Sequence, residues 1–119
     1  GHLGSGIIAA AVTTHLEISP TELARLLREG RAPRVIDVRE PHEWAIARIE
    51  GTELRPLSAI QTWWRELDPD EPVVFVCHHG RRSAAVCRAL AAEGFTAVHD
   101  LVGGVEAWRL EVDPSMPAY

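Results

Sequence analysis

Cysteine is scarce in this chain of 119 residues, which contains only Cys77 and Cys87. Two cysteines cannot form the disulfide framework that holds many small secreted domains together. Cys77 is followed directly by His78 and His79, a spacing unsuited to one tetrahedral metal ion, and no second Cys/His pair completes a ligand set. We therefore expect no metal and no other cofactor. Cys87 lies in an alanine-rich stretch and is expected to be a small buried side chain, since a bond to Cys77 would distort the predicted helix.

The chain also lacks an excess of positive charge. Its 12 basic and 17 acidic residues give a formal net charge of -5, which disfavours nucleic acid or an anionic membrane as a partner. No apolar run has the length of a membrane span, and the short run 7–12 has no positive leader and no cleavage site. The expected compartment is the reducing cytoplasm.

Internal repeats, low-complexity tracts and linkers are absent, so the length predicts a single domain. Residues 1–13 are interpreted as a tag remnant and N-terminal extension, because the first six resemble an expression-tag scar. The predicted domain covers residues 14–112, and residues 113–119 form a C-terminal tail.

Strand patterns and helix patterns alternate along the predicted domain. Short strands are expected over 14–18, 34–38, 52–54, 73–76 and 96–99. Helices are expected from a cap at Ser19 to a stop at Gly30, over 40–48, 58–67 and 83–93, and through Trp108. This alternation predicts an α/β fold in which a parallel sheet of about five strands carries helices on both faces.

The strongest chemical signal is Cys77, at the junction between the apolar strand 73–76 and the helix 83–93. Such a junction directs backbone N–H groups and the positive end of a helix at one point, which stabilises a thiolate, the nucleophilic form of cysteine. Arg81 and Arg82 add positive charge, Gly80 permits a tight turn, and Ser83 can cap the helix. Ligands of parallel sheets bind at the carboxyl ends of the strands. Two further residues, Asp37 and Arg39, lie at or just past the carboxyl end of the neighbouring predicted strand 34–38. They are expected to converge on the Cys77 loop as an ion pair or loop support.

Three segments resemble motifs of the rhodanese family of sulfurtransferases. The loop Cys77-His78-His79-Gly80-Arg81-Arg82-Ser83 resembles the family's Cys-x-x-Gly-x-Arg-Ser loop, segment 36–44 resembles its Asp-Val-Arg-Glu box, and segment 101–108 resembles its Gly-Gly-x-x-Ala-Trp ending. The resemblance covers about residues 16–108 and implies a rhodanese-like domain. One departure is Ala47-Arg48-Ile49, where many relatives have Gly-His-Ile, so Arg48 adds positive charge or changes a local hydrogen bond.

The resemblance also implies a mechanism. Cys77 takes the outer sulfur of a donor such as thiosulfate as a persulfide and passes it to a thiophilic acceptor, cyanide in the usual assay or a thiol. Arg82 is expected to fold back and brace the loop. Arg81, His78 and His79 are expected to face the anionic end of the donor.

Two alternatives remain open at this point. A cysteine phosphatase or arsenate reductase holds a tetrahedral oxyanion in a loop one residue longer than the one from Cys77 to Arg82. A sulfur-relay or interaction module would use the same Cys77 persulfide with a protein donor or acceptor. The sequence leaves open the physiological donor and acceptor, the oligomeric state, and whether the chain is a whole protein or one domain of a longer one.

Overall fold

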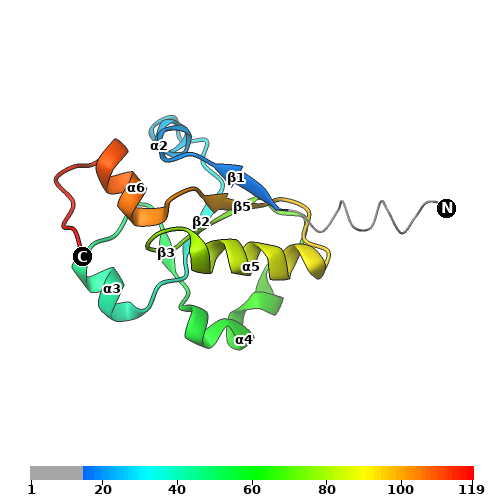
Figure 1. The fold of residues 1–119 in the computed structure, drawn as a ribbon. Helices are drawn as coiled ribbons and strands as arrows, with labels where there is room; N and C mark the ends of the chain where they lie inside the picture. The colour runs from blue at the N-terminus through cyan, green and yellow to red at the C-terminus, as the bar shows by residue number, and fades with distance from the viewer. Residues whose placement is uncertain (1–14) are drawn as a thin grey trace.

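The computed structural model describes residues 15–119, and the expected tag remnant and extension at 1–13 lie outside these residues. The chain forms a five-stranded sheet surrounded by helices (Figure 1). In chain order the elements are β1 (Leu16–Ile18), α2 (Pro20–Arg28), β2 (Arg34–Asp37), α3 (Pro41–Ile46), β3 (Glu53–Leu54), the 3₁₀ helix η1 (Leu57–Ala59), α4 (Ile60–Trp63), the 3₁₀ helix η2 (Trp64–Glu66), β4 (Val73–Val76), α5 (Arg81–Ala92), β5 (Val98–Leu101) and α6 (Gly104–Glu111).

All strands are parallel and follow the order β1-β5-β4-β2-β3 across the sheet. The predicted α/β fold with a parallel five-stranded sheet is therefore confirmed. The central strand β4 is buried along its whole length, as expected for a strand that helices cover on both faces.

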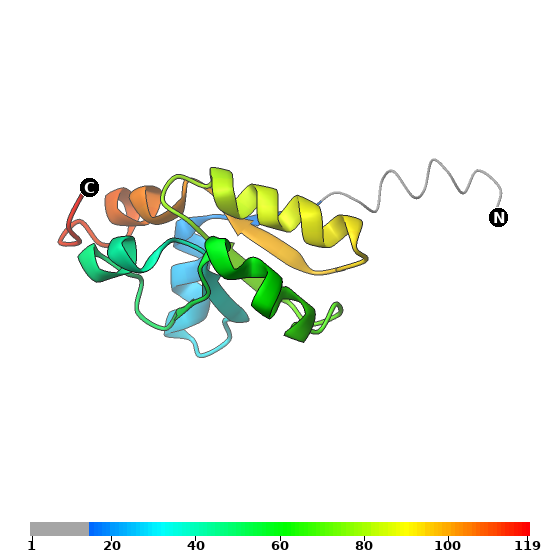
Figure 2. The same cartoon turned by 90° about the horizontal axis from the view of Figure 1, so that it is seen from below.

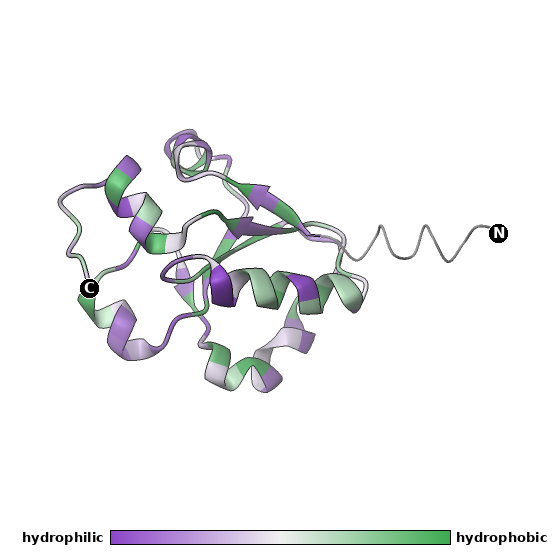
Figure 3. Ribbon diagram, viewed as in Figure 1, coloured by the Kyte–Doolittle hydropathy of each residue, from purple (hydrophilic) through white to green (hydrophobic). Residues whose placement is uncertain are grey.

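Two apolar clusters, one on each face of the sheet, hold the layers together. One joins α4 and α5 to the face that carries Ile36 and Phe75, and the other joins α2 and α6 to the face that carries Val35 and Val74. Figure 2 shows the same arrangement from below. In Figure 3 the hydrophilic colour on α5 is deepest at its first turn, where the two arginines follow Gly80, and the rest of the helix is mostly pale green.

The last strand lies further along the chain than expected. The prediction of 96–99 was wrong by two residues, because β5 begins at Val98 and continues through His99 and Asp100 to Leu101. Pairing on both sides sets this position: Val98 pairs with Val73 of β4, and Leu101 pairs with Ile18 of β1. The shift places a polar residue, Asp100, in the strand beside Cys77.

The predicted helix 58–67 was also wrong as one continuous element, since it consists of η1, α4 and η2. Trp63 is 2% exposed, and its indole N–H donates to the carbonyl oxygen of Pro56 at 2.9 Å. This bond and the packing of Trp63 on Phe75 hold the short turns against the sheet. Tertiary contacts here override the helical period of the sequence.

Candidate active site

Cys77 follows β4 directly, and its sulfur accepts hydrogen bonds from two backbone N–H groups. The side chain is 1% exposed. Its Sγ accepts hydrogen bonds from the backbone N–H of Gly80 at 3.1 Å and of Ser83 at 3.3 Å. Both N–H groups belong to the turn that opens α5, so the amino end of a 12-residue helix faces the sulfur. Two backbone N–H donors and the positive end of a helix therefore meet at the sulfur, where they interact favourably with negative charge.

Two glycine positions shape the loop. Gly80 is the residue before α5 and has a φ of 99°, which side chains rarely allow. Gly104 opens α6 with a φ of 62°, and a side chain there would collide with the carbonyl oxygens of Cys77 and His78. Those carbonyls accept hydrogen bonds from the first turn of α6, at 2.9 Å from Val105 N–H and 3.0 Å from Glu106 N–H. The Gly-Gly motif therefore allows α6 to dock on the Cys77 loop.

Arg82 turns away from the sulfur and pairs with Glu43 of α3. Its two terminal nitrogens donate to the two carboxylate oxygens at 2.7 and 2.8 Å, in the parallel fork that is the strongest form of this pair. The Arg82 guanidinium, through this hydrogen bond, lowers the pKa of Glu43 to about 2. Arg82 thus braces the loop against α3.

Asp37 and Arg39 form a second, fully buried ion pair behind the loop. Both side chains are 0% exposed, and the shortest N–O distance is 2.8 Å. Arg39 also donates to the carbonyl oxygen of Ala47 at 2.7 Å and to the hydroxyl of Tyr119 at 2.6 Å. The Tyr119 hydroxyl donates in turn to Glu43 at 3.0 Å, so the two ion pairs form one connected network.

Three aromatic rings lie in a stack beside the loop. His78 lies between His79 and Tyr119, with ring centroids 3.9 and 3.8 Å away, and the Tyr119 ring is nearly parallel to it at 8°. Burial, and then the neighbouring His79, lower the pKa of His78, so the neutral imidazole is favoured. His79 and Arg81 are exposed and make no ion pair within residues 15–119, which leaves them available to an anion.

A different set of contacts lies on the β5 side of the sulfur. The Ser83 hydroxyl is 3.3 Å from Cys77 Sγ and also donates to the Asp100 carboxylate. Ser83 is 0% and Asp100 is 5% exposed. Burial raises the pKa of Asp100 above its ordinary value.

Cys87 is also buried, but it lies in the apolar cluster beneath α5. Burial raises the pKa of this thiol, so it stays protonated. Its environment agrees with the expected structural role. Within residues 15–119, no group of three or more His, Cys, Asp and Glu side chains could hold a metal ion, and no helix has the length and apolar character to cross a membrane.

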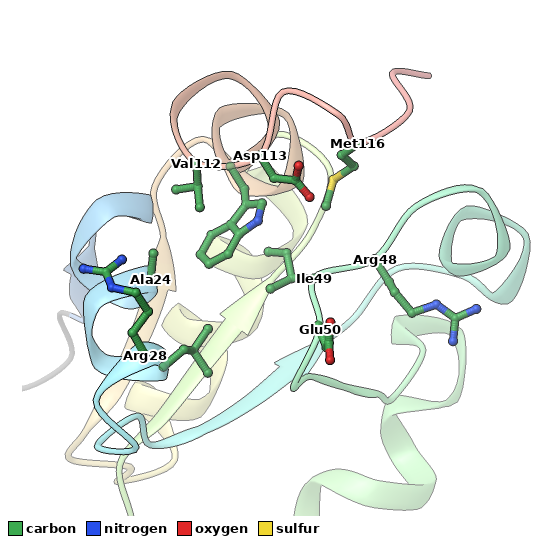
Figure 4. Close-up of a pocket in the computed structure, with 10 residues that line it drawn as sticks. Ala24, Arg28, Arg48, Ile49, Glu50, Val112, Asp113 and Met116 are labelled. Atoms are coloured by element: carbon green, nitrogen blue, oxygen red, sulfur yellow. The ribbon is translucent and has the colours of Figure 1, made fainter.

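A cavity of about 380 Å³ lies elsewhere, between α2, the segment before β3 and the end of α6 (Figure 4). None of the residues singled out from the sequence as site residues lines it. Arg48, the departure from the family pattern, does line it, with its guanidinium 4.6 Å from the centre of the Trp44 ring. No cysteine, serine or threonine lines this cavity, so we assign the candidate active site to the Cys77 loop.

The structure brings the sequence-predicted site residues together around one loop: Cys77, His78, His79, Gly80, Arg81, Arg82 and Ser83, with Asp37 and Arg39 behind it. Sequence reasoning assigned no role to Glu43, Asp100 or Tyr119. Asp100 lies one residue beyond the predicted strand 96–99, so the sequence pattern did not place it in the buried sheet. The contacts of Tyr119 had no signal either, since a tail has no periodic pattern to follow.

The fold and the site together define a class of protein. It is an α/β domain that holds a thiol at the amino end of a helix, between two glycine turns. The chain belongs to the rhodanese family, because the model of the rhodanese-like domain matches residues 19–111. Thiosulfate sulfurtransferase GlpE of Pseudomonas fluorescens is 39% identical over 90 residues, covering 76% of this chain and 82% of GlpE.

Longer relatives contain a similar domain. The probable adenylyltransferase/sulfurtransferase MoeZ of Mycobacterium tuberculosis is 37% identical over 113 residues, covering 93% of this chain and 29% of MoeZ. The chain spans less than a third of the length of such relatives. Among solved structures, a rhodanese-related protein from Thermoplasma volcanium matches with a TM-score of 0.71 and 31% identity, covering 82% of this chain and 94% of the other.

Proposed function

We propose that this protein transfers sulfane sulfur from thiosulfate, or from a persulfide donor, to a thiophilic acceptor through a persulfide on Cys77. The observation that carries the proposal is the position of Cys77 Sγ, which accepts two backbone N–H bonds at the start of α5. The same groups that stabilise the thiolate can stabilise the anionic persulfide that replaces it.

Each half-reaction is one displacement at sulfur. The Cys77 thiolate attacks the outer sulfur of thiosulfate, the S–S bond of the donor breaks, and sulfite leaves with the bonding electron pair. Cyanide then attacks the outer sulfur of the persulfide, thiocyanate leaves, and the thiolate is restored. Exposed His79 and Arg81 are the cationic or polar groups of the loop that can meet the donor's anionic end, since Arg82 is held by Glu43.

Intact-mass spectrometry of the reduced protein after thiosulfate treatment tests the proposal. We expect a gain of one sulfur atom that cyanide removes. Cys77→Ala should abolish the gain, whereas Cys87→Ala, the matched control for the other thiol, should keep it. Absence of the added sulfur in a protein whose Cys77 is free and reduced would contradict the thiosulfate reaction.

A second candidate, sulfur relay with a protein donor or acceptor, is favoured by the MoeZ relative, whose name couples an adenylyltransferase with a sulfurtransferase. It uses the same persulfide, so the donor decides between the two. Slow turnover with thiosulfate beside fast Cys77 loading by a cysteine desulfurase would favour relay. The two free cysteines of the described structure suit a reducing compartment, and we propose the cytoplasm.

Phosphatase or arsenate reductase activity is the weaker candidate. Arg82 would have to leave Glu43 to hold an oxyanion, and its loop from Cys77 is one residue too short for that class. Hydrolysis of a small aryl phosphate, measured beside Cys77→Ala, checks this, and we expect no Cys77-dependent turnover.

A further inference from the structure

Asp100 is a buried carboxylate that no cationic side chain of residues 15–119 contacts directly. It is 5% exposed, and it forms no ion pair within residues 15–119, unlike buried Asp37 and Glu43. The hydroxyl of Ser83 is the hydrogen-bond partner of its side chain. A buried charge with so little compensation is costly, and such groups concentrate at functional sites.

Ser83 connects this carboxylate to the reactive sulfur. Its Oγ has three polar neighbours: Cys77 Sγ at 3.3 Å, the carbonyl oxygen of Gly80 at 3.3 Å, and the Asp100 carboxylate. The hydroxyl has one hydrogen to donate and two lone pairs to accept with. When it donates to Asp100, a lone pair is free to accept the S–H of Cys77; when Asp100 is protonated and donates to it, the hydroxyl is free to donate to the thiolate.

We infer that Asp100 accepts the proton of Cys77 through Ser83, so that the thiol and the carboxylate share one proton. In this step the S–H bond breaks and its electron pair stays on Sγ. The proton bonds to Ser83 Oγ, while the hydrogen of Ser83 passes to Asp100 and forms a carboxylic acid. A neutral thiol and a carboxylate become a thiolate and a neutral acid, with no change in total charge and no co-reactant. Asp100 is thus a positioning residue, acting through Ser83.

The far side of Asp100 offers an exit for the proton. Asp100 lines a cavity of about 410 Å³ between the start of α5 and the turn that precedes α6. His79, Arg81 and Arg88 line the same cavity. The charged and titratable groups that act on Asp100 from its neighbours are His15, just before β1, Glu17 within β1, and Arg88 on α5. The neutral thiol of Cys87 on α5 also lies close to it.

This inference rests on the proposed function, because a proton acceptor matters only if the Cys77 thiolate is the nucleophile. Burial raises the pKa of Asp100, which brings the carboxylate closer to the thiol in proton affinity. Two groups that share a proton titrate together, so the thiolate is formed in two steps as pH rises. The lower step ends in the state in which the two groups share one proton, so only a fraction of the molecules carry the ionised sulfur beside the neutral acid.

The experiment is the pH profile of Cys77 alkylation by iodoacetamide, read by mass in a Cys87→Ala background without any sulfur donor. We expect two steps in the parent protein. Asp100→Asn removes the proton acceptor but keeps the shape of the side chain, and it should give one step. At the pH of the parent protein's plateau, the thiolate fraction of Asp100→Asn should be about tenfold lower than that of the parent. Ser83→Ala keeps both titrating groups but removes the connecting hydroxyl, and it should also lose the lower step.

Glu17→Gln is the matched control, because it removes a carboxylate at the position paired with Asp100 and leaves the connection intact. It should keep both steps. His78 and His79 are present in every variant, so a step that disappears with Asp100 is not theirs. A parent profile with one step, or two steps that survive in Asp100→Asn, would overturn the inference. Because the readout is the thiol itself, sulfur transfer can fail while this result stands.

Discussion

The two carboxylates that flank the Cys77 loop, Glu43 on the α3 side and Asp100 on the β5 side, have opposite surroundings. Glu43 meets the guanidinium of Arg82 and the hydroxyl of Tyr119, and its pKa is lowered to about 2. Asp100 meets one hydroxyl, and burial raises its pKa. On the α3 side, the loop is therefore held by a carboxylate whose charge is compensated by Arg82, and we call this the compensated side. On the β5 side, it is contacted by Asp100, a carboxylate without an ion-pair partner, and we call this the uncompensated side.

The difference separates a carboxylate that supports the loop structurally from one that can exchange a proton. A carboxylate whose oxygens are all paired with cations and N–H groups stays ionised across the working pH range, so it can hold a loop in place but cannot exchange a proton. A carboxylate with little compensation costs stability and is poised to take a proton. If the comparison holds, substitutions on the Glu43 side should change stability, whereas substitutions on the Asp100 side should change proton transfer at Cys77.

The largest expected effect is on the compensated side, at the buried pair Asp37–Arg39. Arg39→Met leaves the Asp37 carboxylate buried without its cation, and we expect a loss of about 3–5 kcal/mol in the free energy of unfolding. Urea denaturation measures it. Arg65→Met, which removes an exposed guanidinium lying over Trp64, is the control and should cost less than about 1 kcal/mol.

A double variant sharpens this result. Replacing both partners, Asp37→Leu with Arg39→Met, removes the unpaired charge and should recover part of the loss. If Arg39→Met alone unfolds at the same urea concentration as the parent, the buried pair does not support the loop.

Glu43→Gln should have the next largest effect. Because the pKa of Glu43 is about 2 against an ordinary 4.5, its contribution to stability is complete above pH 4.5 and is lost as pH falls through about 2. With Arg82 partly exposed, we expect the contribution to be about 2 kcal/mol after allowing for solvent screening.

Thermal unfolding at a series of pH values checks both the size and the sign of this effect. Glu43→Gln should lower stability at neutral pH and flatten the acid limb of the curve. Glu66→Gln, which removes an exposed partner of Arg55, should change neither. An unchanged acid limb in Glu43→Gln would assign the acid sensitivity to another group.

Asp100→Asn should change stability in the opposite direction. A carboxyl whose pKa is raised on folding stabilises the folded state below its ordinary pKa of 3.8, and this contribution is lost as pH rises through the folded value. The neutral amide avoids that loss, so we expect the variant to gain roughly 1 kcal/mol at neutral pH, the low end of the cost of a poorly partnered buried group. The same thermal series measures it, and a clear loss at neutral pH would make the Ser83–Asp100 bond a structural one.

Much of this site could be predicted from the sequence, because its determinants are local. The residues from Cys77 to Ser83 are contiguous, and the strand and helix that flank them have distinct patterns, so the position of the thiol followed directly. Asp37 and Arg39 are two residues apart, and their placement at the end of a neighbouring parallel strand follows from the topology.

The rest depended on distances that the sequence does not contain. The role of Asp100 required the register of β5, which pairing with β1 and β4 sets and which the pattern placed two residues too early. Glu43 meets Arg82 across 39 positions, and Tyr119 meets Arg39 across 80. No periodicity in the sequence connects such positions. Only the folded structure therefore shows that Tyr119, in the C-terminal tail, belongs to the compensated side.

The smallest expected effect concerns that tail. Tyr119→Phe keeps the ring on His78 but removes the hydroxyl that accepts from Arg39 and donates to Glu43. Tyr119 is 39% exposed, so water can replace the hydroxyl, and we expect a loss of only about 0.5–1 kcal/mol with little change in sulfur transfer. Tyr119→Ala removes the ring as well and frees His78, so it should raise the KM for thiosulfate more than it lowers kcat. Steady-state kinetics of both variants measure this difference. Equal kinetics in Tyr119→Phe and Tyr119→Ala would show that the Tyr119 ring contacts the site but does not affect thiosulfate binding. The residues of the compensated side that matter for activity would then be limited to Glu43 and Arg82.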